Sequence, residues 1–187
     1  MTWTRTATGY TVFQGNIKDA CEDKTDLSFG MFNPVAQSAS HLFTHHEIQL
    51  VSRAGTNHIG IGMYMADPAT GTRWTLMLNP RPNSLDDSRF NKPKPGILYT
   101  GSSERAGSHL IILDAAYFGF PTIGTSGFTS FDVNWDSLLS YVQGKGYWST
   151  LWPVLSRATA SVEIETQTFG LGSRLRINHR AWDQWNP

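Results

Sequence analysis

The chain has 187 residues, of which 40% are hydrophobic and 12% aromatic, enough for one substantial core and too few to require a second. Its 15 basic and 15 acidic side chains cancel without forming blocks, which argues against nucleic acid or an anionic membrane as a partner. No apolar run approaches the roughly 20 residues of a membrane span. We therefore expect one soluble domain over residues 1–187. Its compartment stays open, and a secreted protein is expected if a leader has been removed.

Alternating polar and apolar residues between turn signals predict antiparallel sheets. Tyr10–Phe13 is a possible first strand, and the charged segment 16–34 is expected to be a connection. Later strands are predicted at 41–51, 57–65, 72–78, 97–99, 108–113, 158–169 and 174–178. We expect turns around Gly55, at Asp67–Gly71 and at Gly170–Gly172, with a long polar connection over 79–96.

A single short helix is predicted after Asn134, a suitable N-cap, with Leu138, Leu139 and Val142 on its apolar side. The sequence Gly144-Lys145-Gly146 is expected to end it. Many short strands with one helix favour an all-β fold. We predict a two-layer antiparallel β-sandwich or jelly roll with one short α-helix.

The segment 162–167 would place Glu163, Glu165 and Gln167 side by side, because alternate residues of a strand point to one face. Carboxylates and amides in such a row suit the hydroxyl groups of a sugar. The same pattern is also typical of any solvated strand face. Both interpretations stay open.

Glu47 lies in a comparable row, between His45 and Gln49, on the polar side of the strand predicted at 41–51. Paired with Glu165, or with Glu163, it would supply the two carboxylates that most glycosidases use. In the strand predicted at 57–65, the side opposite the apolar residues carries Tyr64 and two glycines, which leave room for a ligand.

Tryptophan is abundant, with seven residues, and flat indole rings stack well on sugars. Five of these residues fall in expected loops or at strand ends: Trp135, Trp148, Trp152, Trp182 and Trp185. Trp74 and Trp148 are our candidates for lining a site, although most tryptophans belong to cores.

Histidines offer a rival hypothesis, because His41, His45 and Glu47 could share a strand face and bind zinc or iron. No established metal motif fits their spacing, and no phosphate-binding or nucleophile-elbow motif is present. The single cysteine, Cys21, has no partner for an internal disulfide. We expect neither a metal nor a cofactor.

The C-terminal third resembles glycoside hydrolase family 12, a concanavalin-like jelly roll, in the helix WDSLLSYVQGKG, the strand VEIETQTFGLG and the closing strand RLRIN. The resemblance implies an acid/base glutamate in a pattern like G-T-E-P-F and a nucleophile in a pattern like Y-E-(L/I)-M-I-W. HHEIQLV would then place Glu47 at the nucleophile. ETQTF sets Gln167 at the acid/base position, with Glu165 two residues away.

Three functions follow as hypotheses. The first is a glycoside hydrolase that cleaves a β-glucan-like polysaccharide, with Glu47 as nucleophile and Glu165 or Glu163 as acid/base. The second is a carbohydrate-binding module or lectin of the same architecture, in which these residues only bind the polysaccharide or oligosaccharide. The third is a structural or interaction protein, such as a phage or surface component. The sequence leaves open whether the chain is an enzyme, and it does not define the oligomeric state.

Overall fold

The computed structural model describes the backbone of residues 2–5, 11–21, 27–31, 42–80, 90–102 and 108–185. It describes the side chains of residues 43–50, 59–80, 90–102, 108–160 and 162. The strands are β1 (Thr2–Arg5), β2 (Thr11–Cys21), β3 (Leu27–Met31), β4 (Leu42–Ala66), β5 (Arg73–Asn79), β6 (Ile97–Ser102), β7 (Ser108–Asp114), β8 (Thr129–Asn134) and β9 (Thr159–Trp185). They are accompanied by the helix α1 (Trp135–Gly144) and the 3-10 turn η2 (Trp152–Val154).

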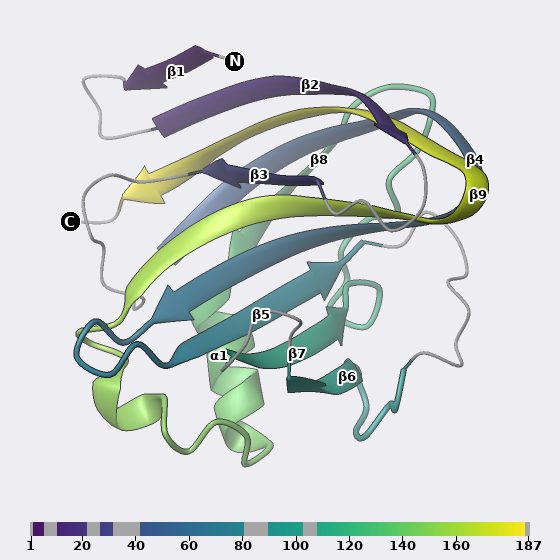
Figure 1. Ribbon diagram of the computed structural model, residues 1–187. Helices are drawn as coiled ribbons and strands as arrows, with labels where there is room; N and C mark the ends of the chain where they lie inside the picture. The colour runs from purple at the N-terminus through teal and green to yellow at the C-terminus, as the bar shows by residue number, and fades with distance from the viewer. Residues whose placement is uncertain are drawn as a thin grey trace.

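Two long strands organise the fold. β4 and β9 pair antiparallel from Leu42↔Trp185 to Ala66↔Thr159. Between the pairs Ala54↔Arg174 and Thr56↔Phe169 the register shifts, so that one residue of β4 faces four of β9. Such bulges bend a ribbon sharply. Figure 1 shows both strands folding back together at this point, so that their halves lie in two layers.

The folded ribbon gives a two-layer β-sandwich. The first layer contains β1, β2, the second half of β9, the first half of β4 and β8. The second layer contains β3, the first half of β9, the second half of β4, β5, β7 and β6. Among the strands that the structure describes, all pairs are antiparallel except β5 with β7, which run parallel.

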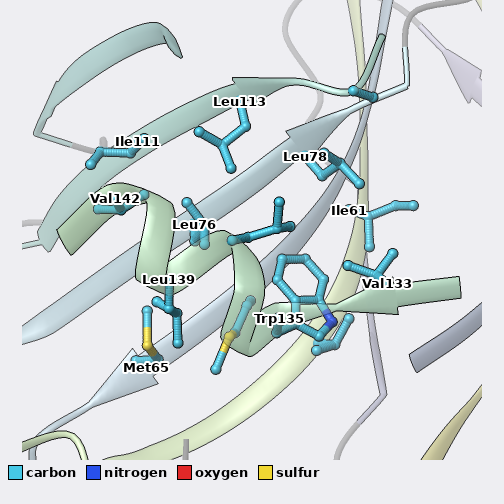
Figure 2. Close-up of a cluster of buried hydrophobic side chains, with 14 of the residues drawn as sticks. Ile61, Met65, Leu76, Leu78, Ile111, Leu113, Val133, Trp135, Leu139 and Val142 are labelled. Atoms are coloured by element: carbon cyan, nitrogen blue, oxygen red, sulfur yellow. The ribbon is translucent and has the colours of Figure 1, made fainter. Parts of the chain in front are cut away.

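One apolar core joins both layers to α1. Ile48 and Leu50 of the first layer and Ile59 and Ile61 of the second are at most 3% exposed and belong to one cluster. Figure 2 shows α1 residues packing against β5, β7 and β4 of the second layer. The helix begins as expected, because the Asn134 side chain accepts a hydrogen bond of 3.1 Å from the Ser137 amide.

The β-sandwich and the helix confirm the predicted fold class, whereas several element boundaries were wrong. The turns expected at Gly55 and at Gly170–Gly172 do not reverse the chain; they lie at the bend of the ribbon, and β4 and β9 run through them. Segment 16–34 was expected to be a connection, yet it holds the end of β2 and all of β3. β1 and β8 were not predicted.

An ion pair holds the β4–β5 hairpin against the start of β9. Arg157 donates from Nε and Nη2 to the two carboxylate oxygens of Asp67, at 3.0 Å each. The Ala69 amide and the Thr70 hydroxyl also donate to this carboxylate, at 3.1 and 3.0 Å. The hydrogen bond from Arg157, with these others, holds the pKa of Asp67 well below its ordinary value.

We expect Asp67→Asn to lower Tm at pH 7, with a deficit that shrinks as the pH falls below about 4. The folded pKa of Asp67 lies below its unfolded value, so the unfolded chain binds the extra proton in acid. The carboxylate therefore stabilises the fold above the unfolded pKa, and this contribution is lost as the pH falls. Thermal unfolding from pH 7 to pH 2 measures the effect. A deficit that stays constant over this range would contradict it.

Candidate functional site

One face of the second layer carries little side-chain bulk on β4. Ile59, Ile61 and Met63 are buried in the core, so the alternating residues Gly60, Gly62 and Tyr64 lie on the opposite face. We call this the glycine face. A strand without side chains lets a neighbouring ring or ligand approach the backbone.

The acidic positions of β9 stand beside this strip. Glu163 pairs with Gly62 and Glu165 with Gly60, while Gln167 pairs with His58. Directly paired residues of antiparallel strands share a face. The register therefore places positions 163 and 165 on the glycine face, next to the two glycines.

Two tyrosine rings lie on this face over glycine backbone. A Cβ on Gly62 would be 2.8 Å from Cε2 of Tyr64, and one on Gly101 would clash with the Tyr99 hydroxyl. Each glycine is thus needed to admit the neighbouring ring. Two strands lie between the two rings. Met77 of β5 pairs with Gly62 of β4 and, on its other side, with Ile112 of β7. Ile112 in turn pairs with Tyr99 of β6. Met77 is only 4% exposed, so the apolar surface beside the acidic positions comes from the two half-buried tyrosine rings.

Glu47 lies elsewhere. It occupies the first half of β4, where it pairs with Ser130 of β8 and Arg180 of β9. The alternate residues Thr44, His46, Ile48 and Leu50 are buried, so Glu47 lies on the outer face of the first layer. On that face His45 contacts Asp132, with 2.6 Å between Nδ1 and Oδ1. Gln49 lies on the same face, because alternate residues of a strand point to one side.

Glu47 and Glu165 are therefore not brought together. They belong to different layers and to outer faces that point away from the shared core. Packed sheets are about 10 Å apart between backbones, and side chains that point away from each other add to this separation. Glycosidase carboxylates lie about 5–9.5 Å apart. The backbone register instead places positions 163 and 165 on one face.

The tryptophan candidates lie in or against the core. Trp74 is only 1% exposed, and β5 directs it to the core face beside Leu76 and Leu78. The prediction that Trp74 lines a site was therefore wrong, because a ligand has no access to its ring. Trp148 packs partly buried against the core, with a positive φ of 58°.

The metal hypothesis involved His41, which lies outside the described residues. Within the part of the chain that is described, no group of three or more His, Cys, Asp or Glu residues could hold a metal ion.

Among the described helices, none has the length and apolar character that a membrane span requires.

An open cavity of about 510 Å³ lies at the edge of the second layer. Its wall is formed by residues 92–98 and Asp114. The sequence reasoning missed Asp114 of this wall and Tyr99 of the glycine face. Alternation in 108–114 separates the two faces of β7, but only the pairing of β7 with β5 and β6 brings Asp114 and Tyr99 to the same layer as the glycines of β4.

No family model matches this sequence, and no curated protein is significantly similar to it. Solved structures are similar in fold. A family 12 xyloglucanase from Bacillus licheniformis has a TM-score of 0.52 and 12% identity, over 95% of this chain and 81% of the other. The endoglucanase 3 of family GH12 from Trichoderma harzianum has a TM-score of 0.51 and 13% identity, over 98% and 94% of the two chains. The chain therefore has the β-sandwich fold of these glycoside hydrolases, and the likeness extends far beyond the C-terminal third.

Proposed function

We propose that this chain is a carbohydrate-active domain that binds a β-glucan-like polysaccharide on its glycine face. The observation that carries the proposal is the register of β9 on β4, with Glu163 opposite Gly62 and Glu165 opposite Gly60. Carboxylates accept hydrogen bonds from sugar hydroxyls. The Tyr64 and Tyr99 rings supply apolar surface for stacking.

Hydrolysis is the second candidate function, favoured by the two acidic positions on one face. Residues two apart on a strand have Cα atoms about 6.6 Å apart, since each residue advances about 3.3 Å. Side chains that leave one face of a strand at this Cα spacing are long enough to hold their carboxylates about 6.5–9.5 Å apart, the separation typical of inverting glycosidases, in which one carboxyl group is the acid and the other activates water. Glu163 and Glu165 would fill these roles. The structures of similar fold include enzymes named as a xyloglucanase and an endoglucanase.

Electrophoresis through native gels that contain xyloglucan, mixed-linkage β-glucan or carboxymethylcellulose tests the binding proposal. Retardation in at least one glycan gel, relative to a gel without glycan, is the expected result. Reducing-sugar release from the same polymers separates an enzyme from a binding module. A chain that is retarded by none of the polymers and releases no sugar from them would instead fit a structural or interaction protein.

A further inference from the structure

Two lysines from distant parts of the chain meet beside the end of α1. The Lys94 ammonium group donates to the Lys145 backbone carbonyl at 2.8 Å, although the two residues are 51 positions apart. Lys94 is exposed and Lys145 is half-buried. The fold therefore creates a local positive charge that the evenly mixed charges of the sequence do not reveal.

Tyrosine rings hold both ammonium groups in place. Lys145 Nζ lies 4.9 Å from the centre of the Tyr141 ring, and Lys94 Nζ lies 5.4 Å from the centre of the Tyr147 ring. Cations are attracted to the faces of aromatic rings. Within the described part of the chain, neither lysine forms an ion pair with a carboxylate. The two positive charges are thus held by uncharged groups, and they can pair with an anion that binds from outside.

The charge around these lysines is mostly positive. Lys92 and Lys94 line the open cavity of about 510 Å³, where the described lining holds one acidic residue, Asp114. The Asp114 carboxylate already accepts a hydrogen bond of 3.1 Å from a backbone amide. Asp136 lies in the first turn of α1, about 13 Å along the helix axis from Lys145. The surroundings therefore favour an anion over a cation.

An exposed aromatic ring stands next to this charge. Tyr117 is 54% exposed, and its ring packs over Gly96 of the cavity wall, where a Cβ would be 2.5 Å from the ring. The centre of the Tyr141 ring lies 6.2 Å from that of Tyr117, and the Tyr141 hydroxyl donates to the Pro95 carbonyl. Exposed rings that are fixed in this way can stack on sugar rings. We call the following residues the tyrosine–lysine patch: Lys94, Tyr117, Tyr141, Lys145 and Tyr147.

We propose that the tyrosine–lysine patch binds a glycan whose sugar units carry carboxylate groups. A uronic acid unit offers both matching features, a ring face for Tyr117 and an anion for the two lysines. Acidic side chains of a peptide supply the anion but no ring. Because α1 packs against the core side of the second layer, the patch is a separate surface from the glycine face. The proposal therefore goes beyond the binding of a neutral β-glucan and adds a second class of ligand.

Calorimetric titration with trigalacturonic acid tests the proposal, and its methyl ester serves as an uncharged ligand of similar shape. The wild type is expected to bind the acid at least tenfold more tightly than the ester, because only the acid pairs with the lysines. Its affinity is expected to fall as salt rises from about 50 to 300 mM, since ions screen exposed charges. The double variant Lys94→Gln/Lys145→Gln should bind the acid about tenfold more weakly, and Tyr117→Ala about fivefold more weakly.

Two control variants match the charge and the ring. Arg73→Gln removes a positive charge from an exposed position at the start of β5, about 20 Å along the strand from the residue that pairs with Asp114. Phe128→Ala removes an aromatic ring that is 38% exposed. Both controls are expected to bind the acid within about twofold of the wild type.

Each contrary outcome identifies what is wrong. Equal binding of the acid by the wild type, the double lysine variant and Tyr117→Ala would overturn the assignment to this patch. No binding of the acid, or equal affinity for its methyl ester, would overturn the whole proposal. Triglutamate bound as tightly as trigalacturonic acid would overturn the glycan in favour of an acidic protein. The proposed β-glucan binding is tested separately, because neutral polymers address the glycine face.

Discussion

Replacing Trp135 by alanine is expected to lower the free energy of unfolding by about 3–5 kcal/mol. Trp135 is fully buried and begins α1, where it packs with Val133 and Ile61 between the helix and the second layer (Figure 2). Its removal leaves a large cavity at the point where the helix joins the core. Urea denaturation followed by circular dichroism measures the loss.

A hydrogen bond adds to the packing of Trp135. Its Nε1 donates to the Thr44 hydroxyl at 2.8 Å, and this hydroxyl is also hydrogen-bonded to His46 Nε2 at 2.8 Å. The chain of three buried groups ties α1 to the first half of β4. Trp135→Phe keeps most of the volume and removes only the donor, so we expect a smaller loss of about 1–3 kcal/mol.

Phe128→Ala is the control for aromatic truncation, because Phe128 is 38% exposed. Its expected effect is under about 1 kcal/mol. A Trp135→Ala variant that loses no more stability than Phe128→Ala would contradict the packing described for α1.

The second large effect concerns the carboxylates. If the chain hydrolyses glycans, Glu163→Gln and Glu165→Gln are each expected to lower kcat by at least about 100-fold, because each removes an acid or base from the reaction. Glutamine keeps the size and the hydrogen-bonding capacity of the side chain. If the chain only binds glycans, the double variant is expected to bind about tenfold more weakly, from the loss of charge-assisted hydrogen bonds.

Glu47→Gln tests, in the same assays, whether the site lies on the first layer or on the second. Glu47 lies on the outer face of the first layer, so its substitution should leave both kcat and affinity within about twofold of the wild type. A large loss with Glu47→Gln and none with Glu163→Gln or Glu165→Gln would transfer the site to the first layer and contradict the proposal.

The predictable parts of this fold are local. Asn134 and the apolar positions of α1 predict the helix. Alternation from Ile59 to Met65 correctly separates the core residues from the glycine face. Which strands become neighbours depends on long-range pairing, which no local pattern contains. Glu47 and Glu165 have similar surroundings in sequence, yet the bend of β4 and β9 carries them to different layers.

Backbone amide shifts during titration with cellohexaose test the central claim most directly, because they locate the glycan on one face or the other. We predict the largest changes at Gly60, Gly62 and Tyr64 of the second layer, with little change at Glu47. Changes clustered around Glu47 and Ser130 on the first layer, or an unchanged spectrum with every glycan that retards the protein, would contradict it.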